Sequence, residues 1–386
     1  MKIDRRGFLK LMGFGGVVFA SGLGSLGKQA QAISEEGNFF FVQLSDTHWG
    51  FKNLAINPDA ADTLKKAIAA INDLNPQPDF IVFTGDLTHT TDDAQERRKR
   101  LTEFRNLTRG FKTKNIKFLP GEHDAALDNG AAYQEVFGKS YYSFEHEGVH
   151  FIAIDNVSDP TSSIGERQLQ WLSNELQQRG KEDRIVVLTH RPFFSLYPQW
   201  DWWTRDGDKA LDLLKPYKNV MILYGHIHQE NHHRDGQIAE HAAMGMMYPL
   251  PAPGSVPKKE PVAWDPAVPY KGLGYRLVAV KKTGYTLSEY PVNLKEQIIT
   301  IMAKKFEYSP AEIRIKKGVP VILELTSLDR LHGFNCPDLG LRTDIYPGKI
   351  SRLEILAQKT GTFEFFCDVF CGEGHETMTG KIIVED

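Results

Sequence analysis

The sequence predicts an α/β domain followed by a smaller all-β domain. In the first part of the 386-residue chain, short apolar runs typical of buried strands alternate with amphipathic segments of helical period. From residue 298 onward, the pattern changes to short alternating strands. A chain of this length can hold two domains, each with its own core. We therefore place a domain boundary between residues 292 and 298.

In the first domain, most of the predicted strands end in a cluster of Asp, Glu or His. Ligands of α/β sheets gather beyond the carboxyl ends of the strands, so these clusters are expected to meet. The predicted strands cover residues 38–44, 79–84, 116–119, 149–154, 184–189 and 219–223, with a closing hairpin at 275–280 and 284–290. The predicted helices cover residues 59–74, 92–109 and 165–179.

Five motifs at these strand ends carry metal-binding chemistry. They are Asp46-x-His48, Gly85-Asp86, Gly121-Glu122-His123-Asp124, His190 and Gly225-His226-x-His228. Four imidazoles and several carboxylates can hold two divalent metals with mixed nitrogen and oxygen ligands. Two metals about 3.5 to 4 Å apart polarise a phosphoryl oxygen and generate hydroxide for in-line attack. The motifs therefore predict a dinuclear hydrolytic centre.

In type and order, the five motifs resemble those of the calcineurin-like metallophosphoesterases, over about residues 38–292. The resemblance implies a β-sandwich flanked by helices, with manganese, iron or zinc in the centre. It also implies a phosphate-ester substrate, with His123 protonating the departing oxygen or steadying the phosphate charge and Asp124 orienting His123. The implied ligands are Asp46, His48 and His228 for the first metal, Asp86 as a bridge, and Glu122, His190 and His226 for the second.

Two positions depart from the pattern of that family. Glu122 stands where Asn is usual, and its extra negative charge is expected to tighten binding of the second metal and lower its Lewis acidity. His89 stands where many members carry Asp, a position to which we attach less weight. The aromatic stretch 193–203 either walls the substrate site or packs as a lid, and His232 and His233 are expected on a hairpin loop.

A loop near the carboxyl terminus combines thiolates, an imidazole and a thioether. Cys367, Cys371, His375 and Met378 have the spacing C-x-x-x-C-x-x-x-H-x-x-M, and His332 lies upstream. Soft sulfur beside imidazole favours copper, and two bridging thiolates can hold two copper ions. The alternative is a disulfide or a zinc clip.

This loop resembles the binuclear CuA site of cytochrome c oxidase subunit II and nitrous oxide reductase, over about residues 298–386. The resemblance implies a Greek-key cupredoxin domain with two copper ions. The implied ligands are His332, Cys367, Cys371, His375, Met378 and the backbone carbonyl of Val369. Cys336 is expected to be a buried thiol, with an extra ligand or a redox thiol as the second reading.

The amino terminus resembles a twin-arginine signal peptide over residues 1–32. Arg5 and Arg6 precede an apolar run and a small-x-small cleavage site, which predicts export to the periplasm through the twin-arginine machinery. An uncleaved membrane anchor is the alternative, and no membrane span is expected in the mature chain. The net charge of −3 becomes more negative without this basic segment, which argues against a nucleic-acid partner.

Together, these features predict a periplasmic phosphoesterase with an attached copper domain that transfers electrons or senses redox state. A soluble cytochrome is a candidate redox partner. The alternative is a non-hydrolytic electron-transfer or copper-handling protein in which the phosphoesterase fold is a binding module. Glu122 favours this alternative, whereas the presence of every other ligand and of His123 and Asp124 argues against it.

Overall fold

The computed structural model describes residues 17–20, 39–265, 270–281, 284–291, 297–317, 321–355, 357 and 359–385. The chain divides into two compact units, Met1–Trp264 with Tyr270–Asn293, and Asp265–Pro269 with Leu294–Asp386. The predicted signal peptide lies outside the described residues except for β1 (Val17–Ala20), which pairs in parallel with β12 (Gly284–Pro291). Among the described residues, no helix has the length and apolar character that a membrane crossing requires.

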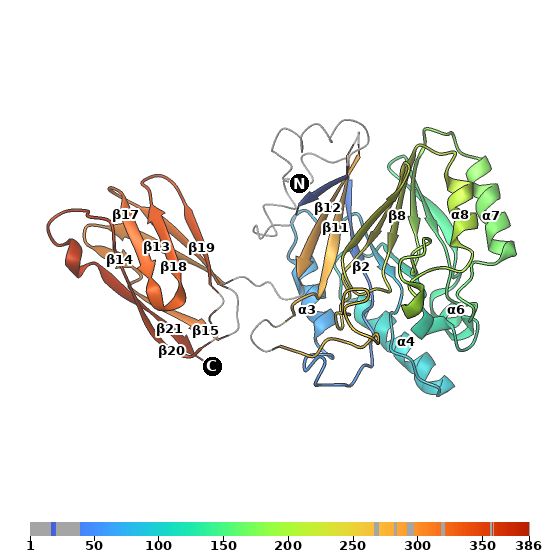
Figure 1. The fold of residues 1–386 in the computed structure, drawn as a ribbon, viewed down its shortest axis with the longest axis horizontal. Helices are drawn as coiled ribbons and strands as arrows, with labels where there is room; N and C mark the ends of the chain where they lie inside the picture. The colour runs from blue at the N-terminus through green and yellow to red at the C-terminus, as the bar shows by residue number, and fades with distance from the viewer. Residues whose placement is uncertain are drawn as a thin grey trace. The chain divides into compact units, whose positions relative to one another are not determined.

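The first unit contains two six-stranded sheets (Figure 1). One sheet has the order β1-β12-β11-β2-β3-β4 and the other β5-β6-β7-β8-β10-β9. The first also comprises β2 (Phe39–Leu44), β3 (Phe80–Thr84), β4 (Ile116–Leu119) and β11 (Gly274–Lys281). The second comprises β5 (Tyr142–His146), β6 (Val149–Ala153), β7 (Arg184–Leu188), β8 (Asn219–Tyr224), β9 (Asn231–Asp235) and β10 (Ile238–Ala242).

Strand β2 shows why the central strands are apolar throughout. Phe39 and Phe41 face a core shared by both sheets, whereas Phe40 and Val42 face a second core beneath helices. Because side chains alternate across a strand, a strand that is buried on both faces has no polar side.

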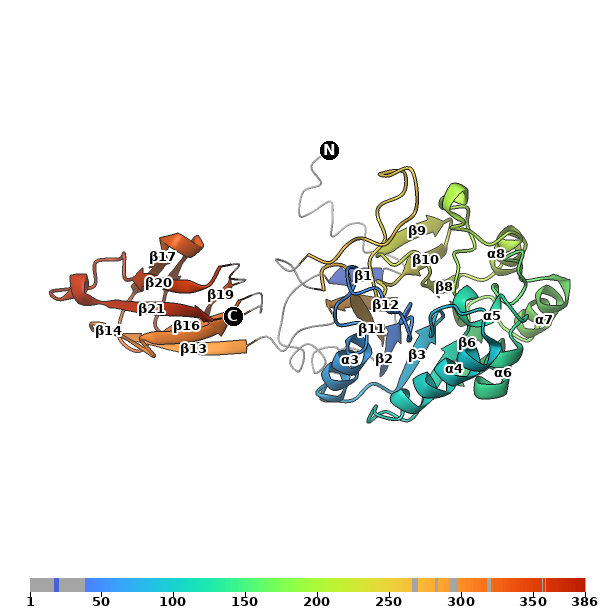
Figure 2. The same cartoon turned by 90° about the horizontal axis from the view of Figure 1, so that it is seen from below.

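Helices cover the outer faces of the two sheets (Figure 2). The helices α3 (Thr63–Asn72), α4 (Ala94–Thr108) and α6 (Ala131–Phe137) pack on the first sheet. The helices α7 (Glu166–Gln177) and α8 (Gly207–Leu214) pack on the second. The predicted sandwich flanked by helices is confirmed.

Parallel pairing brings the predicted metal-binding motifs to one edge of each sheet. Strands β2, β3 and β4 run parallel, as do β6, β7 and β8. The carboxyl ends of parallel strands lie at the same edge, so the motifs that follow them become neighbours.

The structure places both the aromatic stretch 193–203 and the two histidines that follow the Gly-His-x-His motif. His232 and His233 lie in β9, not in a loop, because β9 pairs antiparallel with β10. In the aromatic stretch, Trp200 and Trp202 are buried in a cluster with Tyr224. These two rings therefore pack on their own unit, as the lid interpretation expects.

The second unit is all-β, with a four-stranded sheet β14-β13-β16-β19 and a five-stranded sheet β15-β21-β20-β17-β18 around one core. The first comprises β14 (Glu307–Ser309), β13 (Gln297–Lys304), β16 (Val321–Ser327) and β19 (Ser351–Ile355). The second comprises β15 (Glu312–Lys316), β21 (Thr379–Glu385), β20 (Gly361–Phe366), β17 (His332–Cys336) and β18 (Leu341–Ile345). The alternating pattern predicts strands at residues 298–302, 311–315, 319–326, 350–357, 361–366 and 381–384, so it misses β14, β17 and β18. His332 lies in strand β17, whose run His-Gly-Phe-Asn-Cys is short and contains a Gly.

Candidate metal centres

The turns at the strand ends hold the first site in an unusual backbone conformation. Ten non-glycine residues of the described chain have positive φ, and half of them are predicted metal ligands. Such residues are strained by about 1 to 3 kcal/mol each and concentrate at functional sites. These ligands are Asp46, His48, Asp86, His226 and His228, with φ of 55°, 39°, 49°, 65° and 53°.

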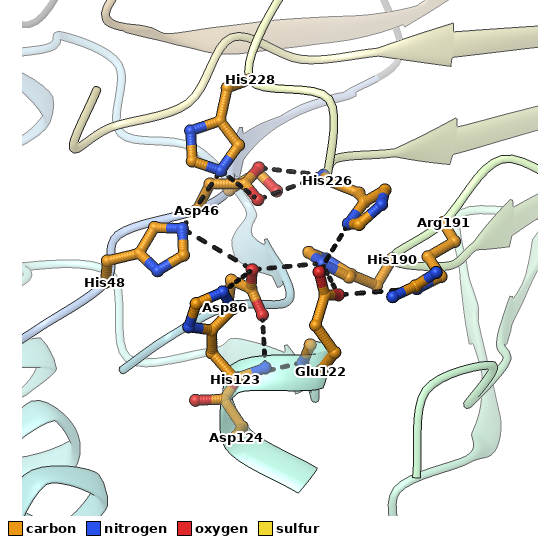
Figure 3. Close-up of polar contacts among 12 residues, drawn as sticks. Asp46, His48, Asp86, Glu122, His123, Asp124, His190, Arg191, His226 and His228 are labelled. Atoms are coloured by element: carbon orange, nitrogen blue, oxygen red, sulfur yellow. Dashed lines mark hydrogen bonds and ion pairs between the residues drawn. The ribbon is translucent and has the colours of Figure 1, made fainter. Parts of the chain in front are cut away.

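The first group of ligand atoms comes from Asp46, His48, Asp86 and His228. These atoms lie within 4.8 Å of one another, and all four residues are buried. His228 Nε2 is 3.3 Å from Asp46 Oδ1, and His48 Nε2 is 3.6 Å from Asp86 Oδ2 (Figure 3). Two carboxylates and two imidazoles thus converge on one point.

The second group comes from Glu122, His190 and His226. Glu122 Oε2 is 2.9 Å from His190 Nε2, and Glu122 Oε1 is 2.9 Å from His226 Nδ1. Asp86 Oδ2 is also 3.5 Å from His190 Nε2. The carboxylate of Asp86 therefore lies between the two groups, where a bridging ligand has to be.

The imidazoles present lone pairs to these groups because their far nitrogens are occupied. His190 Nδ1 is 2.7 Å from the carbonyl of Thr84, and His228 Nδ1 is 2.6 Å from that of Tyr248. Each of these nitrogens must donate to a carbonyl, so in the neutral ring the other nitrogen carries the lone pair. Among the described residues, no hydrogen bond of acceptable geometry reaches the buried atoms Glu122 Oε2, His190 Nε2 and His226 Nδ1, although Glu122 lies 2.9 Å from both imidazoles. The residues present fit two divalent cations.

The pKa shifts agree with a site built for cations. Burial lowers the pKa of His48 well below its usual value, and the neighbouring His123 lowers it further. Burial raises the pKa of Glu122, but His226, Arg191 and His190 together outweigh burial and lower it. Burial lowers the pKa of His190, but Asp86 and Glu122 outweigh it and raise that pKa, so a proton competes with a metal there.

His123 lies at the edge of the site, with its side chain 24% exposed and Nε2 3.9 Å from Asp86 Oδ2. Its Nδ1 accepts from the backbone N–H of Thr90 at 3.1 Å, and Thr90 Oγ1 is 2.6 Å from the same nitrogen. A backbone N–H can only donate, so the proton of the neutral ring is on Nε2 and faces the site.

Asp124 was expected to orient the ring of His123, but the structure places its carboxylate on backbone amides. The carboxylate of Asp124 accepts from the backbone N–H groups of Gly121, Leu87 and Thr88 at 2.8 to 2.9 Å. Neighbouring residues on the short helix α5 (Glu122–Ala125) point about 100° apart, so the two side chains diverge. Asp124 joins two site loops through their backbones, and Thr90 orients His123.

Three further residues belong to the site. Tyr248 stacks on His48 and His228, with ring centroids 5.0 and 4.5 Å apart. His89 Nδ1 is 3.4 Å from His48 Nδ1, so its position matters more than we expected. Arg191 Nε is 3.6 Å from Glu122 Oε2. The sequence could have indicated Arg191 as a site residue, because it directly follows His190. Tyr248 lies in a loop without a recognisable motif, so nothing in the sequence indicates its role.

Only glycine fits at position 225, because the backbone there passes close to Ser45 and Asp46 beneath the first group of ligand atoms. A Cβ on Gly225 would lie 1.8 Å from Ser45 Oγ and 2.7 Å from Asp46 Oδ2. We expect Gly225→Ala to displace Asp46, lowering both the unfolding temperature and the metal content after reconstitution with Mn²⁺. Gly236→Ala is the control for metal content, because a Cβ there meets nothing within 4 Å, although its φ of 57° costs an alanine some stability. Unchanged metal content in Gly225→Ala would contradict this expectation.

The second centre lies in the all-β unit. Cys367 Sγ and Cys371 Sγ are 3.9 Å apart and both cysteines are free, so the structure does not form the alternative disulfide. His375 Nδ1 is 3.5 Å from Cys371 Sγ, and ligand atoms of His332, Cys367 and Cys371 lie within 4.8 Å of one another.

The ring of His332 is oriented toward these thiols. Its Nε2 is 2.7 Å from Asp329 Oδ1, and its Nδ1 is buried without a hydrogen-bond partner. The carbonyl of Val369 is 3.2 Å from Cys367 Sγ. Met378 is 1% exposed, and its backbone carbonyl accepts from the N–H of Cys367 at 3.1 Å. The residues present fit copper, because sulfur and imidazole donors converge in a buried site.

Cys336 is separate from this ligand set. It is buried in the core of the second unit, and burial raises the pKa of its thiol. It lies four positions after His332 along strand β17, a separation of about 13 Å. The structure thus agrees with a buried packing thiol.

The folds and sites define a metallohydrolase-like sandwich joined to a copper-protein-like β domain. Residues 41–230 match the family model of the calcineurin-like phosphoesterases, and residues 278–384 match that of the cupredoxin-like domain. The chain is a calcineurin-like metallophosphoesterase domain fused to a cupredoxin-like domain.

Known proteins resemble one unit or the other. Cytochrome c oxidase subunit 2 of Thermus thermophilus is 28% identical over 88 residues, 23% of this chain and 65% of that protein. The match thus spans less than two thirds of that relative. The serine/threonine-protein phosphatase CPPED1 of Danio rerio is 25% identical over 219 residues, 50% of this chain and 71% of that protein. A dimetal phosphatase structure from Danio rerio shares the fold, with a TM-score of 0.50, 13% identity, and coverage of 67% of this chain and 98% of that one.

Proposed function

We propose that the first unit hydrolyses phosphate esters at a dinuclear metal centre. The observation that carries the proposal is the position of Asp86 between two groups of buried ligand atoms, several of which lack a hydrogen-bond partner. Two divalent cations bound there would polarise a phosphoryl oxygen and activate water. Manganese, iron and zinc all suit a mixture of carboxylate and imidazole ligands.

The residues of the site divide this work. Asp46, His48 and His228 hold the first cation, and Glu122, His190 and His226 hold the second, with Asp86 between them. His123, fixed by Thr90, presents its Nε2–H to the phosphoryl group or the departing oxygen. Its partial exposure allows contact with a substrate that enters from solvent.

For the second unit, we propose a CuA-like pair of copper ions that transfers electrons or senses redox state. Two thiolates 3.9 Å apart between two imidazoles support this proposal, as does the similarity to cytochrome c oxidase subunit 2. A soluble cytochrome is the proposed redox partner. We place the protein in the periplasm, on the twin-arginine pattern of residues 1–32.

The second candidate is a non-hydrolytic electron-transfer or copper-handling protein. The observations that favour it are Glu122 in place of a neutral ligand and the absence of a direct contact between Asp124 and the ring of His123 among the described residues. In this case the first unit binds metal or phosphate without turnover.

One experiment separates these functions. Turnover of a chromogenic phosphodiester and a phosphomonoester is measured on the metal-loaded protein with copper first oxidised and then reduced. We expect turnover of at least one substrate. A several-fold change with copper state, lost in Cys371→Ser, would establish redox control, and constant turnover would mean that the two units work independently. No turnover in either state would favour the second candidate.

A further inference from the structure

Arg191 is a buried cation beside the second ligand group. The residue is 4% exposed, and its Nε lies 3.6 Å from Glu122 Oε2 (Figure 3). Within the described part of the chain, this Nε has no hydrogen-bond partner. Its Nη1 donates to the carbonyl and to the carboxylate of Asp201, at 3.0 and 2.6 Å. The Nη1 group of the guanidinium is therefore hydrogen-bonded to Asp201, whereas its Nε faces Glu122.

The backbone around Arg191 is held firmly. The buried side chain of Asn156 donates to the carbonyl of Arg191 at 2.9 Å and accepts from its N–H at 3.3 Å. The carbonyl of Asp201, which receives Arg191 Nη1, is also 3.1 Å from His226 Nε2. The arginine is thus tied to two residues of the second group, Glu122 and His226, and directly follows the third, His190.

We propose that Arg191 is a positioning residue that offsets the charge of Glu122, so that the second ligand group behaves as if this ligand were neutral. The proposal rests on the dinuclear centre described above. Glu122 belongs to the second group and Asp86 borders it, so two carboxylates face this metal position, and the guanidinium adds one opposite charge 3.6 Å from Glu122. Screening by solvent is weak for buried charges, so this positive charge acts strongly on a cation bound nearby.

The contact with Asp201 does not by itself explain the buried arginine. The side chain of Asp201 is 55% exposed, whereas that of Arg191 is 5% exposed. An exposed carboxylate is a weak partner for a buried guanidinium, because water competes for it. Glu122, at 21% exposure, is the more buried of the two carboxylates. Arg191 then largely cancels the loss of Lewis acidity that Glu122 is expected to cause at the second metal.

A double-mutant cycle tests the proposal on the full-length protein. Binding of Mn²⁺ to the second site is measured by calorimetry for Arg191→Met, Glu122→Asn and the double variant, with turnover measured in parallel. Arg191→Met should bind the second Mn²⁺ at least about 10-fold more tightly and turn over more slowly, whereas Glu122→Asn should bind it at least about 10-fold more weakly. Because the two substitutions change the net charge beside the second metal in opposite directions, the double variant should return to within a few-fold of the wild type.

Two further variants distinguish this role from a structural one. Arg191→Lys keeps the charge and should keep the metal affinity of the wild type. Asp201→Asn weakens the exposed contact and should leave the affinity for Mn²⁺ nearly unchanged. An Arg191→Met variant that binds Mn²⁺ no more tightly than the wild type would overturn the proposal. So would a double variant that keeps the weak binding of Glu122→Asn, or an Asp201→Asn variant that reproduces Arg191→Met. Thermal unfolding of the metal-free variants verifies that each is folded.

The test is independent of the proposed hydrolysis. If the wild type binds two Mn²⁺ ions but turns over no ester, the hydrolytic function fails while the affinities still decide the role of Arg191. If the wild type hydrolyses esters but Arg191→Met does not tighten the binding of Mn²⁺, only the role of Arg191 fails.

Discussion

Asp86→Asn is expected to lose at least one of the two divalent metals and more than about 100-fold in phosphoesterase turnover. Loss of a residue that only supports a metal ligand typically lowers metal affinity or activity 10- to 100-fold. Asp86 lies between the two ligand groups and is itself a proposed ligand, so its loss should cost more. Its Oδ2 is 3.6 Å from His48 Nε2 and 3.5 Å from His190 Nε2. An amide has the same shape but lacks the negative charge, and only its oxygen can bind a metal, so it cannot hold two cations together.

Metal content per chain and turnover of a chromogenic ester together check this expectation. Asp79→Asn is the matched control, because Asp79 lies at the opposite end of the same strand and is 35% exposed in its side chain. Both variants should keep the unfolding temperature of the metal-free wild type within a few degrees. An Asp86→Asn protein that retains two metals and full turnover would refute the bridging role of Asp86.

Cys367→Ser is expected to reduce the copper content from two ions per chain to one or none. The thiolate is the soft ligand in this loop, and a hydroxyl is a poor substitute for it. Cys367 Sγ lies 3.9 Å from Cys371 Sγ and also receives the N–H of Gly333 at 3.3 Å. Removing one of two bridging thiolates leaves a single thiolate, which suits a mononuclear site.

Metal analysis and an EPR spectrum in which one unpaired electron couples to two copper nuclei are the measurements. Cys336→Ala is the control, since Cys336 is a buried thiol in the same core and lies outside the ligand cluster. It should lose some stability but no copper. Binding of two copper ions by Cys367→Ser, or loss of copper from Cys336→Ala, would contradict the assignment of the ligands.

Most of the fold could be predicted from periodicity. Strand β2 is apolar throughout because both of its faces are buried. Helix α3 is buried on one face, which gives the helical spacing of Leu64, Ala67, Ile68 and Ile71. Prediction failed where burial leaves no periodic pattern. Strand β17 has only five residues, one of them Gly, and His232 and His233 are polar residues on the edge strand β9.

The candidate sites were predictable in their ligands but not in the residues around them. Asp46, Asp86 and His190 follow strands, so their type and position indicate their chemistry. The contact of Thr90 with His123, and the placement of Asp124 on backbone amides, depend on how side chains diverge along a short helix and a loop. No spacing rule contains that information.

The sequence by itself determined the two-part architecture and the kinds of ligand in each centre, because hydrophobic period and donor chemistry are properties of residues and their order. Only the tertiary structure decided which charges lie together. Glu122 in isolation indicates an over-anionic metal site, but the fold brings Arg191, 69 positions away in the chain, to 3.6 Å from its carboxylate. Electrostatic interactions depend on distance in space and on burial, and neither is written in the order of residues.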